Sequence, residues 1–359
     1  MKLFTIGPTQ SFDVVLKEKN KLIPYFRTDD FSQVVYDVTD KLQKMMFAPD
    51  GSKTIVLTAS GTAAMEAAVM NVFSDKDKLL VINGGTFGKR FTQICDNCKL
   101  DYTEIKLSFD EEFTQDTLSC YSNKGYTGLL VNIDETSIGK LYDIKIISKF
   151  CKENNMLLMV DAISSFLCDE YNMSENNIDV TIISSQKGLC CSPGLSFITL
   201  SPDALKKIES EQNRNLPLYY DFADYLNNLK RGQTPFTPAV GIVYECLASL
   251  SYIESIGLQN FLNSIAEKAH YFRSKLSDMP VEIPKFKKSN AVTTVIFEKP
   301  VARKLFTYLK DKYGIFIKPC GGENAEYMIR VAHIGNLSKN DFDMLIEKIN
   351  EFLTMENNV

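Results

Sequence analysis

The sequence predicts an α/β fold in which a mainly parallel seven-stranded sheet lies between helices and a smaller C-terminal α+β domain follows. From about Thr54 to Leu200, short apolar runs alternate with amphipathic stretches, which is typical of βαβ units. After Pro238 the pattern changes to two long helical stretches and then to strands interleaved with helices. The 359 residues are 45% hydrophobic, which is enough for the cores of about two domains. We expect an N-terminal segment over residues 1–15, a large domain over 16–256 and a small domain over 257–359.

Seven apolar runs in the first region have the length of buried strands. Because a parallel sheet is covered on both faces, its strands are continuously apolar. The expected strands are residues 54–58, 78–82, 102–105, 128–132, 157–161, 180–184 and 195–200. Helices are expected between them at residues 62–73, 87–98, 114–122 and 144–154. A sheet of this kind binds its ligands at the carboxyl ends of its strands.

The second region begins with two long helical stretches, at residues 241–256 and 258–276. Strands are then expected at residues 292–297, 315–318 and 328–331, and helices at 301–313 and 339–352. This mixture predicts the smaller α+β domain.

Composition and charge exclude several classes of protein. The formal net charge is −5 and the basic residues are scattered, so no nucleic-acid partner is expected. The apolar run at the start of the chain ends at Gly7-Pro8, too early for a signal peptide. No apolar stretch approaches the ~20 residues that a membrane span needs. Nine cysteines, an odd number without a secretion signal, favour the cytoplasm, and the single CxxC at Cys95 and Cys98 predicts no metal site.

Two polar turns that follow predicted strands contain candidate ligand-binding residues. Ser60, Gly61 and Thr62 combine small side chains and hydroxyls at the start of a helix, which suits an anion, although an ordinary helix cap would look the same. The glycine-containing turn 83–90 includes Phe87, a flat apolar face, but it lacks the GxGxxG fingerprint of dinucleotide sites. By itself, this second turn is better explained as a plain loop.

Two charged residues also lie at or shortly after the ends of apolar runs. Asp161 ends the run 157–161, where a buried carboxylate needs a partner unless it serves as a structural cap. Lys187 follows the run 180–184 and is either a snorkelling surface lysine or a desolvated amine that can react with an aldehyde.

These four strand-end features together are the groups that pyridoxal phosphate (PLP) requires. The phosphate needs an anion site, and the aldehyde needs a lysine. The pyridine nitrogen needs a carboxylate that keeps it protonated, so that the ring can act as an electron sink.

The motifs that carry a family resemblance span nearly the whole chain, from residues 7–9 to 330–335. They are Ser60-Gly61-Thr62, Glu135-Thr136-Ser137-Ile138-Gly139, Val160-Asp161-Ala162, Ser185-Gln186-Lys187-Gly188-Leu189 and Pro193-Gly194. On these motifs the sequence resembles the class V branch of fold-type-I PLP enzymes. Within that branch it is similar to the alanine–glyoxylate, serine–pyruvate and 2-aminoethylphosphonate–pyruvate aminotransferases.

The resemblance implies how the cofactor is held. Lys187 would form the Schiff base with PLP and, once released, shuttle the proton at the substrate α-carbon. Asp161 would pair with the ring nitrogen, Phe87 would stack on the ring, and Thr136 would hydrogen-bond the 3-oxygen. The phosphate would be held by Ser60, Gly61, Thr62 and Gln186.

The resemblance also implies a substrate site and a homodimer. Arg330 matches the arginine that grips the substrate α-carboxylate, and its planar fork suits that task. Thr237 matches the residue that reaches the phosphate of the neighbouring subunit. The sequence departs from the pattern at Phe87, where relatives often carry Trp or Tyr, and at Asn132-Ile133-Asp134. These departures remove no catalytic group.

Several alternatives of function stay open at this stage. The donor could be alanine, serine or 2-aminoethylphosphonate, and the acceptor could be pyruvate or glyoxylate. Segments 161–166 and 213–216 resemble the phosphonate enzymes, whereas Gln186 and the segment 234–238 resemble the serine and alanine enzymes. A cysteine desulfurase-like activity, or another class V PLP lyase, would need a nucleophile such as Cys320, and desulfurases carry histidine where Gln186 stands. A non-catalytic PLP-binding sensor would normally carry a DNA-binding domain, for which this chain has no room.

Overall fold

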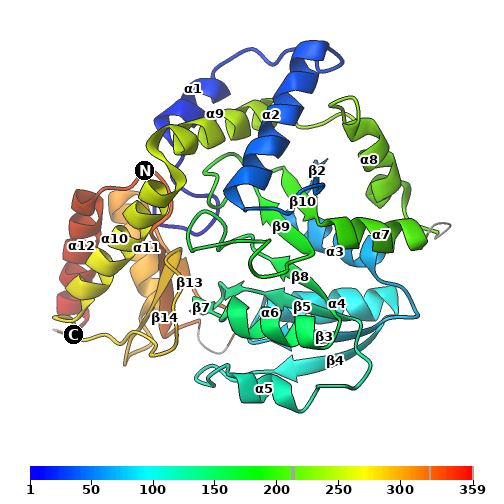
Figure 1. Cartoon of the computed structure of the whole chain (residues 1–359). Coiled ribbons are helices and arrows are strands. Elements are labelled where there is room, and N and C mark those ends of the chain that lie inside the picture. The colour runs from blue at the N-terminus through cyan, green and yellow to red at the C-terminus, as the bar shows by residue number, and fades with distance from the viewer. Residues whose placement is uncertain (212–214, 323–324, 358–359) are drawn as a thin grey trace.

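Seven strands form the central sheet in the order β2-β10-β9-β8-β5-β3-β4 (Figure 1). The computed structural model describes residues 1–211, 215–322 and 325–357. The strands are β2 (Lys53–Leu57), β3 (Lys78–Asn83), β4 (Asp101–Lys106), β5 (Gly128–Asn132), β8 (Leu157–Asp161), β9 (Val180–Ser184) and β10 (Ser196–Leu200). Only β10 runs antiparallel to its neighbours, β2 and β9, and the other four pairs are parallel. The predicted mainly parallel seven-stranded sheet is therefore confirmed.

Helices cover both faces of this sheet because alternate strand residues point to opposite sides. Ile55 and Leu57 of β2 pack in a cluster with Met65 and Phe91, whereas Val56 packs in a second cluster with helices on the other face. The first face is covered by α3 (Gly61–Val72), α4 (Gly88–Cys98), α7 (Pro202–Ser210) and α8 (Phe222–Leu229). The second is covered by α1 (Asp13–Lys19), α2 (Asp29–Met45), α6 (Ile144–Glu153) and α9 (Val240–Ile256).

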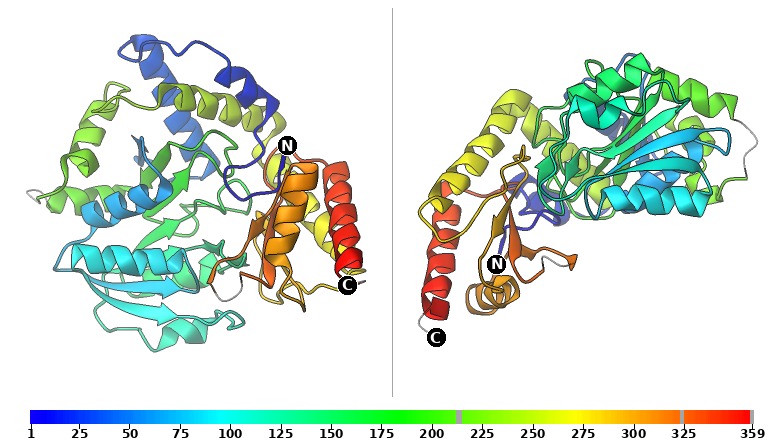
Figure 2. Two further views of the ribbon diagram at one scale, coloured as in Figure 1. Left: turned by 180° about the vertical axis from the view of Figure 1, so that it is seen from behind. Right: turned by 90° about the horizontal axis from the view of Figure 1, so that it is seen from below.

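The C-terminal part forms its own antiparallel sheet and core (Figure 2). Its strands are β11 (Val292–Ile296), β14 (Met328–Ala332) and β13 (Lys318–Pro319), with β14 in the middle. The long helices are α10 (Leu258–Leu276), α11 (Ala302–Tyr313) and α12 (Lys339–Asn357). The start of the chain joins this part, because β1 (Lys2–Leu3) pairs with β12 (Ile315–Phe316) and Phe4 is buried in the same cluster as Phe342.

Several elements differ from the expectation. The expected strand 315–318 is two short strands, β12 and β13, which belong to different sheets, and the expected helix 114–122 shortens to α5 (Gln115–Ser119). Helices α1, α2, α7 and α8 were not predicted. The 17-residue helix α2 had a readable signal, since the Thr28 side chain caps it and Phe31, Val35, Val38 and Leu42 recur at helical spacing.

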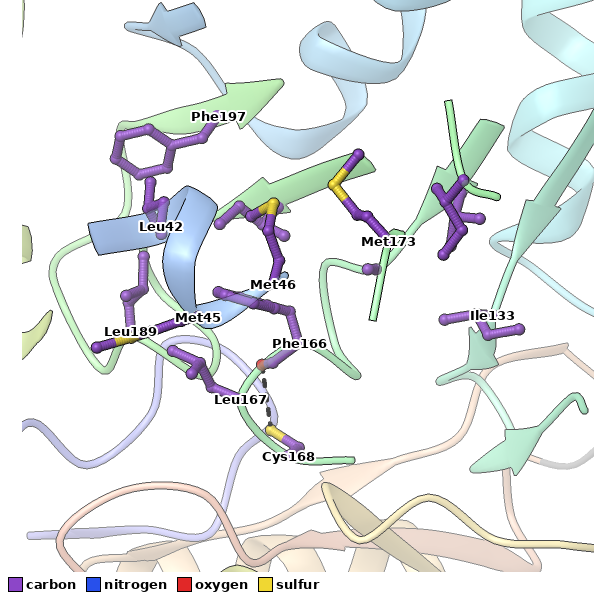
Figure 3. Close-up of a cluster of buried hydrophobic side chains, with 14 of the residues drawn as sticks. Leu42, Met45, Met46, Ile133, Phe166, Leu167, Cys168, Met173, Leu189 and Phe197 are labelled. Atoms are coloured by element: carbon purple, nitrogen blue, oxygen red, sulfur yellow. Dashed lines mark hydrogen bonds between the residues drawn. The ribbon is translucent and has the colours of Figure 1, made fainter. Parts of the chain in front are cut away.

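A buried cluster connects the core to the loops that follow β8 and β9 (Figure 3). Phe166 and Leu167, after β8, and Leu189, after β9, are almost completely buried with Leu42 and Met46 at the end of α2. Close packing of this kind resists displacement. The loop that follows Asp161 and the loop that carries Lys187 are therefore both anchored to the core. None of the helices in the described part of the chain has both the length and the apolar character of a membrane span.

Candidate active site

Four of the predicted site motifs lie just beyond strand ends of the central sheet. Asp161 is the last residue of β8, and Lys187 stands three residues after the end of β9. These two strands are parallel neighbours, so their carboxyl ends lie side by side. Gly61 and Thr62 begin α3 directly after β2, and Phe87 lies between β3 and α4. The topology thus collects these motifs at one edge of the sheet.

Asp161 is a buried carboxylate with two hydrogen-bond donors. Its exposure is 2%, and it accepts from Asn132 Nδ2 at 2.7 Å and from the backbone N–H of Ile163 at 2.9 Å. Burial raises the pKa of Asp161 to about 6, although both hydrogen bonds oppose the shift. A cation bound beside it would favour the ionised form.

Lys187 lies in a crowded, partly buried position. Desolvation lowers its pKa to about 8, the Asp134 carboxylate opposes the shift, and the Arg330 charge adds to it. The N-terminal turn packs against its stem, since a Cβ at residue 7 would lie only 2.9 Å from Lys187 Cδ and Cε. The amine is consequently closer to neutrality at physiological pH than that of an exposed lysine.

Arg330 reaches the same region from the C-terminal part of the chain. It lies on β14, is 7% exposed, and donates from Nη1 to the backbone oxygen of Thr136 at 2.7 Å. Its Nε is buried and has no hydrogen-bond partner within the described residues. A buried guanidinium N–H without an acceptor is costly, so this atom is suited to an anionic ligand.

The Thr136 hydroxyl is held in place by its surroundings. It donates to the backbone oxygen of Asp134 at 3.1 Å and lies 2.6 Å from the hydroxyl of Ser164. Both side chains are almost completely buried.

The remaining predicted residues are more exposed. Ser60 and Thr62 are exposed, Gln186 and Phe87 are partly exposed, and Gly61 is buried. Ser60 is the cap of α3 and accepts from the backbone N–H of Ala63 at 3.4 Å. Thr237 is exposed and lines a surface pocket together with Ile23 and Tyr25.

Several residues that support the site were not predicted from the sequence. Asn132 orients Asp161, Ser164 orients Thr136, and Glu135 is a fully buried carboxylate that binds the loop around Phe87. Asn132 ends β5 and Glu135 follows three residues later on the next short strand, so the largely polar segment 132–135 was a readable signal. Asp134 is fully buried as well, and burial together with the neighbouring Asp169 raises its pKa well above the usual range.

The arrangement suits the cofactor that the resemblance implies. A buried carboxylate at a strand end, a lysine of lowered pKa and a helix N-terminus with hydroxyls match a pyridinium, an aldehyde and a phosphate respectively. The buried Nε of Arg330, which has no acceptor within the described residues, would suit a carboxylate. In the described part of the chain no group of three or more His, Cys, Asp or Glu side chains could hold a metal ion.

Comparison with known proteins agrees with this geometry. The family model described as "Aminotransferase class-V" matches residues 25–338. An uncharacterized aminotransferase of Methanocaldococcus jannaschii is 29% identical over 339 residues, covering 92% of this chain and 86% of that protein. A serine–glyoxylate aminotransferase of Methylorubrum extorquens is 25% identical over 351 residues, covering 94% and 87%. The solved structure of a Thermus thermophilus aspartate aminotransferase superposes with a TM-score of 0.91 at 25% identity and covers 99% of both chains.

Proposed function

Since the chain belongs to the class-V aminotransferase family, whose cofactor is PLP, we propose that it moves an amino group between a small amino donor and a small 2-oxo acid. The proposed donor is alanine, serine or 2-aminoethylphosphonate, the acceptor is pyruvate or glyoxylate, and the two half-reactions alternate at one site. The observation that carries the proposal is that the charges of Asp161 and Arg330 both act on the Lys187 amine, although the three residues come from separate strands or strand ends. Together they supply a nucleophilic amine, a partner for a cationic ring and a fork for a carboxylate.

The proposed roles follow from the chemistry of each side chain. When bound, the cofactor supplies an electron-accepting ring that stabilises negative charge on the substrate α-carbon. Asp161 keeps the ring nitrogen protonated. Lys187 holds the cofactor covalently between turnovers, and its released amine moves the proton at the substrate α-carbon. Phe87 would cover one ring face, the Thr136 hydroxyl would bind the 3-oxygen, and Ser60, Gly61, Thr62 and Gln186 would bind the phosphate.

Attachment of the cofactor should follow the ionisation of Lys187. The neutral amine attacks an aldehyde, and the lowered pKa of about 8 makes this form available. The rate of loading the cofactor-free protein should therefore rise with pH up to about 8 and level off above it, as measured by stopped-flow absorbance. In Arg330→Gln the midpoint should move to higher pH, because a positive neighbour is lost. A rate that keeps rising to about pH 10, the range of an ordinary lysine, would contradict the assignment.

Arg330→Ala is expected to weaken binding of the carboxylate substrate steeply. The variant removes a charge-assisted pair from a buried position, and a loss of a few kcal/mol corresponds to a KM increase of roughly 10²-fold at ~1.4 kcal/mol per tenfold. Steady-state kinetics with varied pyruvate or glyoxylate measures it. Arg273→Lys is the matched control, because Arg273 is also a largely buried arginine but donates to Thr293 and Ser289 instead. An unchanged KM in Arg330→Ala would place carboxylate recognition elsewhere.

A homodimer is also proposed, with Thr237 reaching the partner's cofactor phosphate. The surface beside Thr237 supports this, because Leu22 is 95% and Tyr25 69% exposed in one short apolar stretch. Light scattering should give about twice the chain mass of 40.6 kDa. Leu22→Asp should shift the mass toward one chain, whereas Met355→Asp, on an exposed part of α12, should not. A mass of one chain for the unaltered, cofactor-loaded protein would refute the dimer.

An amino-donor panel tests the proposed function and selects the substrate. Alanine, serine and 2-aminoethylphosphonate should each be offered with pyruvate and with glyoxylate, and the visible absorbance of the cofactor should be followed. Similarity to a serine–glyoxylate aminotransferase supports serine and glyoxylate as the first pair to try. Of the segment 213–216, which resembles the phosphonate enzymes, Asn213 and Arg214 lie outside the described residues. If no donor and acceptor pair changes the visible absorbance of the cofactor, the proposed substrate class is wrong.

The structure does not favour the lyase alternative. Cys320 is buried, its Sγ contacts the backbone oxygen of Ser137 at 3.6 Å, and burial raises the pKa of its thiol despite the neighbouring Arg330. A thiol of raised pKa is a poor nucleophile. The non-catalytic sensor is set aside because the family is one of amino-group-transferring enzymes.

A further inference from the structure

One buried carboxylate outside the proposed catalytic set makes contacts that no role assigned so far explains. Glu135 lies on the short strand β6 (Asp134–Glu135), is 0% exposed, and accepts four hydrogen bonds. The backbone N–H groups of Phe87, Gly88 and Ser137 donate at 3.3, 2.9 and 3.2 Å, and the Ser137 hydroxyl donates at 2.5 Å. The donors of these four hydrogen bonds therefore belong to the loop at Phe87 and Gly88 and to Ser137, which is two residues after Glu135.

The loop that Glu135 binds is the start of α4. Phe87 stands at the cap position of this helix, and its own side chain can offer no cap. The first N–H groups of a helix need acceptors and favour a negative charge. Glu135 supplies both from the short strand β6, which lies outside the central sheet and 48 residues away along the chain. Hydrogen bonds to an ionised carboxylate are stronger than neutral ones, so the backbone at Phe87 is held firmly.

The approach of the two segments is close enough to require a glycine. A Cβ at residue 85 would lie 2.4 Å from Ser137 Oγ and 2.7 Å from Glu135 Cδ. The Ser137 hydroxyl also accepts from the backbone N–H of Thr86 at 3.2 Å. Residues 85–88 therefore lie against the side chains of Glu135 and Ser137 at every step.

The same segment holds the proposed substrate arginine. The backbone oxygen of Thr136, the next residue, accepts from Arg330 Nη1 at 2.7 Å, and the Thr136 hydroxyl faces Ser164. Glu135, Thr136 and Ser137 thus connect the loop of Phe87 with the arginine of the C-terminal part. A displacement of this segment would move both the Phe87 loop and Arg330.

We propose that Glu135 is a positioning residue. It fixes the loop of Phe87 so that the Phe87 ring can stack on the cofactor, and it connects this loop to the segment that binds Arg330. The proposal rests on the proposed function of Phe87 and Arg330. It predicts that loss of the Glu135 carboxylate loosens the Phe87 loop even before cofactor is bound, and then weakens cofactor binding and alters the cofactor's asymmetric environment.

The chain contains no tryptophan, which allows a clean reporter. In Phe87→Trp the single indole should be only partly accessible to acrylamide in the cofactor-free protein, because residue 87 is half-buried, and its emission should be quenched when PLP binds. The quenching by PLP tests the stacking role of residue 87 alone. Acrylamide access in the cofactor-free protein tests Glu135 independently of that role.

Glu135→Ala and Glu135→Gln are then introduced into the Phe87→Trp reporter and into the unaltered protein. We expect the reporter indole to become more accessible to acrylamide, the visible circular dichroism of the bound cofactor to change, and the Kd for PLP to rise roughly tenfold or more in Glu135→Ala. Glu135→Gln, which keeps one acceptor oxygen, should lie in between. Ser137→Ala should shift the same readouts in the same direction, and it keeps the test open if Glu135→Ala folds poorly.

Asp143→Asn is the matched control, because Asp143 also caps a helix, α6, through a backbone N–H at 3.0 Å. It should lower thermal stability while leaving the reporter indole, the dichroism and the PLP affinity unchanged. If Glu135→Gln and Ser137→Ala leave the indole accessibility, the dichroism and the Kd about equal to those of the unaltered protein, the proposal is overturned. If the indole is loosened but PLP never quenches it, Glu135 still positions the loop and the stacking role of Phe87 fails instead.

Discussion

Replacing Lys187 with alanine is expected to abolish multiple turnover while leaving PLP bound without a covalent link. The variant loses both the amine that holds the cofactor and the base that moves the proton at the substrate α-carbon. A general acid–base group alone contributes up to ~10⁴-fold, so the loss should exceed that value. The contacts proposed for Ser60, Gly61, Thr62 and Gln186 remain, so a cofactor absorbance without the Schiff-base band should persist.

Borohydride reduction followed by peptide mapping checks the assignment directly in the unaltered protein. The phosphopyridoxyl group should appear on Lys187 and be absent from Lys140 and Lys268. These two are fair internal controls, because burial lowers the pKa of both, yet Lys140 donates to the backbone oxygens of Phe109 and Glu111 and Lys268 to that of Gly335. A label on either lysine, or a fully active Lys187→Ala, would overturn the assignment.

Asp161→Asn should retain PLP but slow turnover by at least the ~10²–10⁴-fold that a general acid–base group typically contributes. An amide cannot keep the ring nitrogen protonated, so charge on the α-carbon loses its sink. The shape of the residue is preserved, so the structure around Asn132 and Ile163 should survive. Single-turnover kinetics with an amino donor, followed by absorbance, separates this chemical defect from a binding defect.

Asp179→Asn serves as the control for Asp161→Asn. Asp179 precedes β9 at the opposite end of the strand, and burial raises the pKa of this carboxyl to about 6 as well. It accepts from the backbone N–H of Leu158 and the hydroxyl of Ser201, at 2.9 Å each. Its variant should cost stability but leave the turnover of folded molecules near normal. Near-normal turnover in Asp161→Asn would show that another group partners the ring nitrogen.

The order of elements was predictable because buried segments are recognisable from the apolar residues of the segment itself. Strands covered on both faces are continuously apolar, as in 180–184, and the polar residue that ends such a run stands out. Asp161 and Lys187 were found in this way. Helix α2 was missed although its apolar spacing was regular, and the run 315–318 was predicted as one strand because periodicity does not reveal that a chain changes sheets.

The sequence by itself determined the α/β class, the strand-end positions of Asp161 and Lys187, and the motifs of the family. Only the tertiary structure decided which strand ends are neighbours. It also decided that Arg330 donates to Thr136 across 194 residues of sequence and that Glu135 accepts from the backbone of the Phe87 loop. Local patterns record whether a residue is buried within its own element. The partner of a buried charge is chosen by packing between elements far apart in the chain, and hydrogen-bond geometry then selects the atoms that meet.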